Sequence, residues 1–207
     1  YFINLNAIEK PKLYASMNRI LNSAKITHLC GGYSTTFHAG FYLKQDPEKV
    51  YEKIKKQIQH IRKTMDEQGI DIWLRPETTG KQTQFSGLKD LLNISQETQG
   101  VMPCIDFAHM HARTAGKNNT TPEFQAMMNQ VEKILGKEGL KNMHIHMSGI
   151  HYTEKGERHH LPLKESDMNY KDLLKVLKEF KIAGVVISES PIIEKDALLM
   201  NKYYNKI

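Results

Sequence analysis

Short apolar runs alternate with amphipathic helices along the chain, and this alternation constrains the fold more than any other feature. The clearest helix is predicted over residues 47–65, where Asp46 can cap the first turn, Pro47 fits that turn and Gly69 follows the end. Apolar residues recur at helical spacing within it. Similar patterns predict helices over residues 10–24, 88–98, 121–135, 170–180 and 196–204.

Five apolar runs of strand length lie between these helices, over residues 34–37, 70–74, 101–105, 142–147 and 184–187. Repeated strand–helix–strand units predict an α/β fold with a parallel sheet, either open and doubly wound or closed into a barrel. We find no glycine-rich phosphate loop after any run, which argues against a nucleotide cofactor. The chain has no break in composition, so residues 1–207 are predicted to form a single domain.

Composition narrows the class of protein. The chain has 207 residues, of which 40% are hydrophobic and 25% charged, and a net charge of +6. It has no apolar run near the roughly 20 residues that span a bilayer and no secretory signal, so we expect a cytoplasmic protein without a membrane partner. Cys30 and Cys104 lie in apolar stretches and are predicted to be reduced and buried. The excess of basic residues favours a polyanionic partner, nucleic acid first.

Residues that bind metals stand at the end of every predicted strand. They are His38, Glu77, Asp106 with His109, His144, and Glu189. The carboxyl ends of parallel strands meet on one rim, so we expect these groups to converge. Converging carboxylates and imidazoles are costly to desolvate without a cation, and a mixed set favours Zn²⁺, Mn²⁺ or Fe²⁺ over Mg²⁺. Glu157 and His159 follow in a predicted polar loop. His146 is predicted to share a strand face with His144. The remaining candidates are predicted in rim loops, namely His111, His151 and His160.

The order of these segments resembles the endonuclease IV family of apurinic/apyrimidinic endonucleases, within the xylose-isomerase-like TIM barrels. The resemblance covers nearly the whole chain and includes YFINL, FHAG, PETTG, CIDFAH, MHIH, ERHH and SES. It implies a (β/α)8 TIM barrel that here lacks the first two or so strands at the N-terminus. We therefore expect the native protein to be longer, and to be a monomer at full length.

The resemblance implies a cofactor of up to three zinc ions. Glu77 would bridge the first and second ions, with His38 on the first. Asp106, His144 and Glu189 would complete the second site, and His109, Glu157 and His159 would hold the third. Glu77 and Glu189 would be catalytic, with Glu189 orienting or deprotonating the attacking water. The sequence departs from the family in having Glu157 in place of Asp, and the family's histidine before the residue matching Tyr1 is absent.

The implied activity is DNA repair by hydrolysis of the phosphodiester 5′ to an abasic site. Tyr1 and Phe2 match residues that the family inserts into the duplex at the lesion. Six basic residues in predicted rim segments would contact DNA phosphates, namely Lys44, Lys81, Arg113, Lys117, Lys155 and Arg158.

Two other functions fit the same pattern. A sugar isomerase or epimerase of this barrel superfamily would also place acidic residues and histidines at strand ends, although such sites rely more on carboxylates and usually add a lysine. The four histidines at positions 38, 109, 144 and 159 favour the nuclease. A non-catalytic relative that binds nucleic acid is the third interpretation, because one histidine of the first metal site is absent.

Overall fold

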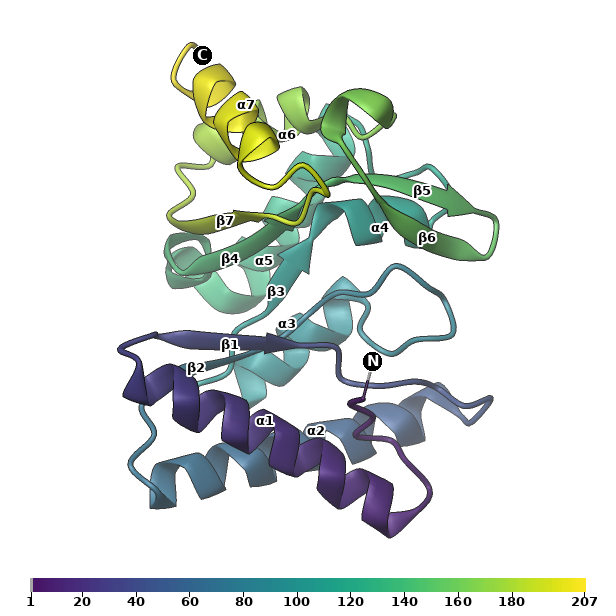
Figure 1. Ribbon diagram of the computed structural model, residues 1–207, viewed down its shortest axis with the longest axis vertical. Helices are drawn as coiled ribbons and strands as arrows, with labels where there is room; N and C mark the ends of the chain where they lie inside the picture. The colour runs from purple at the N-terminus through teal and green to yellow at the C-terminus, as the bar shows by residue number, and fades with distance from the viewer. Residues whose placement is uncertain (1) are drawn as a thin grey trace. The chain divides into compact units, whose positions relative to one another are not determined.

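The structure is a computed structural model that describes residues 2–207, and the chain forms two compact units (Figure 1). The first unit contains residues 2–78 and 83–104, and the second contains residues 79–82 and 105–207. Tyr1, one of the two predicted wedge residues, lies outside the described residues. The prediction of a single domain stays a prediction.

In the first unit, helices pack against a pair of parallel strands. Its elements are α1 (Lys10–Leu29), β1 (Ser34–Phe37), α2 (Pro47–Glu67), β2 (Trp73–Pro76) and α3 (Leu88–Glu97). The Asp46 carboxylate accepts a hydrogen bond of 3.0 Å from the backbone N–H of Lys49 and so caps α2 as predicted. The apolar stripe of α2 and the inner residues of β1 and β2 form one buried core, which includes Phe37, Ile54, Ile58, Ile61 and Leu74.

The second unit continues the strand–helix alternation and adds a hairpin. Its elements are β3 (Cys104–Asp106), which begins at the last residue of the first unit, α4 (Phe107–Arg113), α5 (Thr121–Lys141), β4 (Met143–Met147), β5 (Gly149–Thr153), β6 (Gly156–Leu161), a 3₁₀ turn (Leu163–Glu165), α6 (Tyr170–Glu179), β7 (Gly184–Ser188) and α7 (Glu194–Tyr204). The strand order of its main sheet is β3-β4-β7, and β4 and β7 run parallel.

Two elements were not predicted from the sequence. Helix α4 follows β3 directly because Asp106 serves both as the last residue of the strand and as the cap of the helix. The expected polar loop over residues 155–160 is wrong, because these residues form the antiparallel hairpin β5–β6. One face of the hairpin is exposed, so polar residues are tolerated in it and leave no apolar run to detect.

One of the predicted strands is partly exposed, and the expected burial of Cys30 is wrong. Strand β7 is partly exposed, with Val186 and Ile187 at 42% and 43%, because it is an edge strand of the sheet in the described part of the chain. Cys30 is exposed at the end of α1, where Gly31 turns the chain with a φ of 75°, whereas Cys104 is buried as predicted. Neither Cys30 nor Cys104 forms a disulfide bond.

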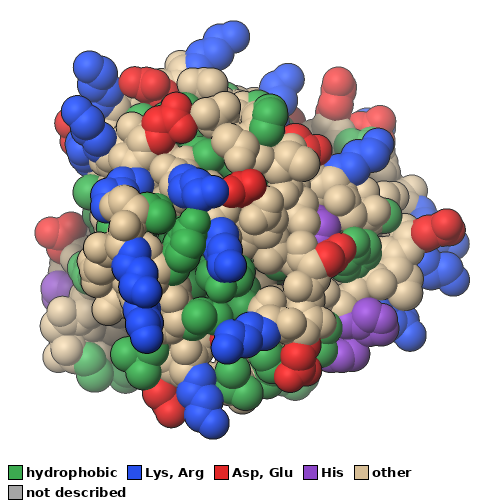
Figure 2. Space-filling view, turned by 90° about the horizontal axis from the view of Figure 1, so that it is seen from above, with side chains coloured by type: hydrophobic (Ala, Val, Ile, Leu, Met, Phe, Trp, Pro, Cys, Tyr) green, Lys and Arg blue, Asp and Glu red, His purple; other side chains and the backbone are tan. Residues whose placement is uncertain are grey.

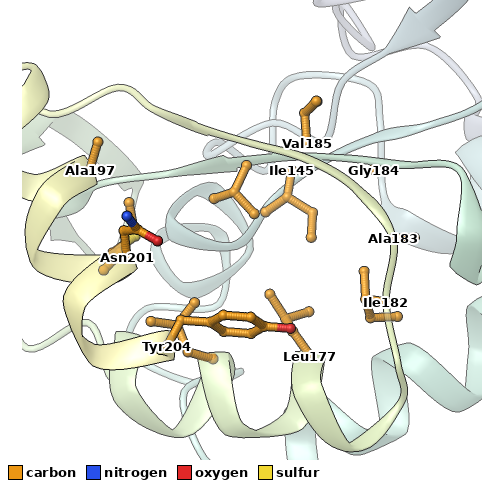
Figure 3. A pocket seen from close by; sticks show the side chains of 12 residues that line it. Ile145, Leu177, Ile182, Ala183, Gly184, Val185, Ala197, Asn201 and Tyr204 are labelled. Atoms are coloured by element: carbon orange, nitrogen blue, oxygen red, sulfur yellow. The ribbon is translucent and has the colours of Figure 1, made fainter. Parts of the chain in front are cut away.

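An apolar cavity of about 330 Å³ lies within the second unit, between β7 and the helices α6 and α7 (Figure 3). Its walls include Ile145, Leu177, Val185, Met200 and Tyr204. These side chains fill the layer between sheet and helices, and the lining contains no carboxylate or histidine. Over residues 2–207, no helix combines the length and hydrophobicity needed to cross a bilayer.

Candidate metal centre

His38 and Glu77 are neighbours in the first unit because of strand register. Phe37 and Pro76 pair across the parallel strands β1 and β2, so the next residue of each strand lies at the same carboxyl end. The Nε2 atom of His38 lies 3.5 Å from Oε2 of Glu77, and the Glu77 side chain is only 8% exposed. The predicted pairing of these two ligands is thus present in the structure.

Arg75 is a charged residue of this unit that the sequence analysis did not single out. It lies two residues before Glu77 on β2, is 1% exposed, and its guanidinium lies 5.9 Å from the Trp73 ring centroid. Its Nη1 donates a hydrogen bond of 3.4 Å to the carbonyl of Pro103. Burial lowers the pKa of Arg75, because desolvation penalises the charged form.

In the second unit, helix capping sets the spacing of Asp106 and His109. Asp106 is fully buried, and its Oδ1 accepts a hydrogen bond of 2.7 Å from the backbone N–H of His109. This cap places the His109 ring over the same carboxylate, with Nδ1 at 3.5 Å from Oδ2. The D-x-x-H pattern therefore has a local cause: a strand ends at an acidic residue that caps the following helix and orients a histidine one turn later.

The other ring nitrogen of His109 faces two further potential ligands. Its Nε2 lies 3.4 Å from Nε2 of His160 and 3.7 Å from Oε2 of Glu157. Neighbouring ligands on a tetrahedral zinc ion, with bonds of about 2.1 Å, are separated by about 3.4 Å. Asp106, His109 and His160 each offer a ligand atom within 4.8 Å of the others. The donor types and separations of this group fit a zinc ion.

The partners of the two imidazoles strengthen this fit. Nδ1 of His160 lies 3.0 Å from the carbonyl oxygen of Glu189, which can only accept, so Nδ1 carries a proton. Nδ1 of His109 lies 3.5 Å from Oδ2 of Asp106. Nε2 of His160 therefore directs a lone pair toward Nε2 of His109. A metal ion between these two nitrogens would take imidazole ligands from both residues.

The structure places His160, rather than the predicted His159, beside His109. Across the hairpin, Tyr152 pairs with Glu157 and His151 pairs with His159, so Arg158 is an extra residue in a β-bulge. The bulge interrupts the alternation of faces, and His160 lies beside His109 while His159 is exposed. His159 instead stacks on His151, with ring centroids 5.0 Å apart.

A second pair in this unit joins β4 and β7. Nδ1 of His146 lies 3.2 Å from Oε1 of Glu189, whose backbone N–H bonds to the carbonyl of Met147. The predicted ligand was His144, which lies two residues earlier and contacts the His146 ring at 5.2 Å between centroids. His146 is closer to the carboxyl end of β4, and that position brings it to Glu189. A metal-binding role for His144 stays a prediction, as does the meeting of the first and second units' ligands around shared ions.

Helix α4, which carries His109, is anchored from its other side. His111 is fully buried, and its Nε2 and Nδ1 lie 3.1 Å from Oδ1 of Asp167 and 2.9 Å from the carbonyl of Lys117. Tyr152 donates a 2.6 Å hydrogen bond to Asp167, which raises the pKa of the tyrosine to about 12. Burial would raise the pKa of Asp167, but the hydrogen bonds from Tyr152 and His111 lower it on balance. His111 is thus a buried support rather than a rim-loop residue.

The predicted DNA-binding residues differ in what their side chains do. Lys44, Lys117, Lys155 and Arg158 are exposed, as is Phe2 at 77%. Lys81 is half-buried, and Arg113 donates hydrogen bonds to the segment 79–82 within its own unit. Figure 2 shows Lys and Arg side chains distributed among acidic and apolar ones on one face.

Comparison with known proteins gives the family. The sequence profile described as Xylose isomerase-like TIM barrel matches residues 1–202. An uncharacterized protein of Methanocaldococcus jannaschii is 46% identical over 207 residues, which is 100% of this chain and 75% of that protein. A protein named Endonuclease 4 homolog, from Dictyostelium discoideum, is 26% identical over 162 residues, covering 77% of this chain and 30% of that protein.

Two solved structures share the fold. Endonuclease IV from Thermus thermophilus aligns with a TM-score of 0.73 at 16% identity, over 100% of this chain and 74% of that chain. A D-tagatose 3-epimerase-like protein aligns with a TM-score of 0.73 at 17% identity, over 99% and 72%. The chain therefore belongs to the xylose isomerase-like TIM barrel family, and the predicted fold class and the resemblance to endonuclease IV are confirmed.

Proposed function

We propose that this protein is a metal-dependent DNA repair endonuclease that hydrolyses the phosphodiester 5′ to abasic sites. The observation that carries the proposal is the group of Asp106, His109, Glu157 and His160, in which two imidazole nitrogens face each other at 3.4 Å with a carboxylate oxygen at 3.7 Å. Such imidazole-rich sets suit zinc. Similarity to a protein named Endonuclease 4 homolog and the net charge of +6 support a DNA substrate.

We expect zinc to be held by residues from three groups of contacts. In the second unit they are His109, Glu157 and His160, with Asp106, and separately His146 with Glu189. In the first unit they are His38 and Glu77. Bound zinc supplies Lewis acidity toward a phosphoryl oxygen. His160 keeps its Nε2 lone pair available because its Nδ1 donates to the carbonyl of Glu189.

Glu189 is the best-placed proton acceptor in the second unit. Its side chain is 31% exposed, so water can reach it, while His146 orients one carboxylate oxygen at 3.2 Å. A carboxylate that water can reach can orient that water or take its proton. Glu77, at 8% exposure, has less access to water and is suited to holding a cation.

DNA would be bound through exposed basic residues rather than through all six of those predicted. Lys155 and Arg158 lie on the exposed hairpin β5–β6 and Lys117 lies in the loop after α4. Contacts of this kind go to phosphates, so affinity for a duplex should fall with increasing salt. Arg113 is excluded from this set because its guanidinium is engaged in intramolecular hydrogen bonds.

A sugar epimerase is the second candidate. The D-tagatose 3-epimerase-like protein and endonuclease IV align equally well, both with a TM-score of 0.73, so fold similarity does not discriminate between the two activities. The donor set supports the nuclease: the contacts in the second unit include three histidines, at positions 109, 146 and 160, and such an imidazole content suits zinc.

The proposal is tested with a labelled duplex that contains one abasic site. We expect the purified protein loaded with zinc to cut the strand 5′ to the lesion and to leave an undamaged duplex intact. Removal of metal with a chelator should abolish cleavage, and zinc should restore it. Conversion of a ketohexose to its epimer without any cleavage would favour the epimerase. Salt-dependent binding of the abasic duplex without cleavage would favour a non-catalytic DNA-binding protein.

A further inference from the structure

Two glycines bring the segment 79–82 against Glu157 in the second unit. The backbone N–H of Glu157 donates a hydrogen bond of 2.9 Å to the carbonyl of Gly80. A Cβ atom added at Gly80 would lie 2.6 Å from both Cβ and Oε2 of Glu157, which is closer than real Cβ atoms approach. A Cβ at Gly156 would collide with the carbonyl oxygen of Gly80, and Gly156 also has a φ of 93°. The two backbones pack at a distance that side chains would prevent.

Arg113 fastens this segment to helix α4. Its Nη1 donates hydrogen bonds to the Thr79 hydroxyl at 3.0 Å and to the carbonyl of Lys81, on either side of Gly80. The Thr79 carbonyl is a third, longer acceptor at 3.4 Å. In return, the Gln82 side chain donates to the carbonyl of Arg113 at 3.3 Å. The guanidinium is half-buried, so these bonds are shielded in part from water.

The same helix carries His109, so the contacts form a closed ring. From Arg113 they pass through the segment 79–82 to Glu157, and from Glu157 back to His109, one turn before Arg113 on α4. Oε2 of Glu157, the atom against which Gly80 packs, is also the atom that lies 3.7 Å from Nε2 of His109. Movement of the segment would therefore move this carboxylate relative to its histidine.

We propose that Arg113 is a positioning residue for metal binding, acting with Gly80 and Gly156 as a clamp that holds the Glu157 carboxylate beside His109 and His160. This clamp assigns a role to the PETTG segment beyond its glutamate, and it replaces the predicted phosphate contact of Arg113. It rests on the zinc site of the proposed function but not on cleavage of DNA. Replacing a residue that orients a metal ligand commonly lowers the metal affinity by about 10-fold to 100-fold.

The test is the zinc affinity of the full chain, measured by competition with a chromophoric chelator. We expect Arg113→Met to lower the affinity for one zinc ion by about 10-fold to 100-fold. Arg113→Lys keeps a charged donor and should recover part of this loss. Lys133→Met removes one charge from an exposed position on α5 and should leave zinc affinity unchanged.

A double-mutant cycle separates positioning from a general structural effect. If Arg113 acts through Glu157, Arg113→Met should cause no further loss of zinc affinity in a Glu157→Gln background. Equal losses in both backgrounds, or no loss in either, would overturn the inference. Should Arg113→Met fail to fold, Gly80→Ala provides the same test, because Gly80 does not have a positive φ and the methyl group would meet Glu157.

The outcomes for this inference and for the proposed function are distinguishable. Normal zinc binding by Arg113→Met with weaker binding of abasic DNA would contradict the clamp and restore the phosphate contact. Zinc loss in Arg113→Met that depends on Glu157 supports the clamp even if the wild-type protein cuts no abasic duplex, in which case only the nuclease proposal fails.

Discussion

Strand β4 has one polar face that carries histidines and one apolar face that packs against helices. His146 lies on one face, 3.2 Å from Glu189, with His144 in ring contact beside it. Ile145 lies on the other face and lines the apolar cavity formed with α6 and α7. Alternation of side chains along a strand produces this division within three residues. The polar face holds ionisable groups that could bind a cation, whereas the apolar face holds the helices on the sheet.

We expect metal binding to depend on the polar residues and folding stability to depend on the apolar face. Burial of apolar side chains stabilises the fold, and buried ionisable groups contribute little to stability unless they are paired. Substitutions among the polar ligands should therefore reduce metal binding and catalysis with a small change in stability. Substitutions in the cavity wall should do the reverse.

The largest effect is expected at Glu77, a proposed metal ligand in the first unit. Glu77→Gln keeps the shape of the side chain but removes the negative charge that faces His38. We expect cleavage of abasic duplex to fall by about 10³-fold or more, since a metal ion contributes several kcal/mol to transition-state stabilisation. Single-turnover cleavage assays measure the loss, and thermal unfolding is the control. A variant with normal cleavage would remove Glu77 from the site.

The next effect belongs to the apolar face. Leu177 lines the cavity and is 4% exposed, so Leu177→Ala enlarges a space that is already present. We expect the free energy of unfolding to fall by about 2 to 4 kcal/mol, measured by urea denaturation, with the number of zinc ions per chain unchanged. If this variant lost zinc while remaining folded, the separation of the two faces would be wrong.

A smaller effect distinguishes two adjacent histidines on β6. His160→Asn should weaken zinc binding by about 10-fold to 100-fold, because it removes a nitrogen that faces His109 at 3.4 Å. His159→Asn is the matched control, since His159 is exposed and stacks on His151, and it should leave zinc affinity unchanged. Titration of metal-free protein with zinc measures both. The reverse order of effects would restore the original prediction of Glu157 with His159.

The smallest effect lies away from both faces of β4, at the start of α5. Oε2 of Glu123 accepts hydrogen bonds from the Thr120 hydroxyl at 2.7 Å and from the Asn119 backbone at 2.9 Å, which lower its pKa to about 2. A carboxyl whose pKa is lower in the folded state stabilises the fold above its unfolded pKa, and this stabilisation is lost as the pH falls from about 4.5 toward 2.

Glu123→Gln should accordingly lower stability by about 1 kcal/mol or less at pH 7 and by less at pH 3, with zinc binding unaffected at neutral pH. Thermal unfolding of both proteins at the two pH values measures this difference. A stability loss that is the same at pH 3 and pH 7 would show that the carboxylate charge is not what stabilises the start of α5.

Local chemistry made much of the fold predictable. Asp46 and Pro47 mark the start of α2, and Pro122 with Glu123 marks the start of α5, because capping and proline preferences act within one turn. Apolar periodicity found the parallel strands, although β2 begins at Trp73 rather than at residue 70. The hairpin β5–β6 was missed because its exposed face carries polar residues and no apolar run marks it.

The pairing of Asp106 with His109 could be read from the sequence, because a helix cap and the residue whose backbone it binds lie within four consecutive residues. The residue types that follow each strand could be read in the same way. Only strand pairing brings His160 next to His109 and His146 next to Glu189. The bulge at Arg158 and the position of a residue along β4 depend on how these strands pair with other strands. The spacing of residues in the sequence does not reveal that pairing. Arg113 was likewise assigned to DNA from its charge, whereas its hydrogen-bond acceptors come from a segment more than 30 residues away.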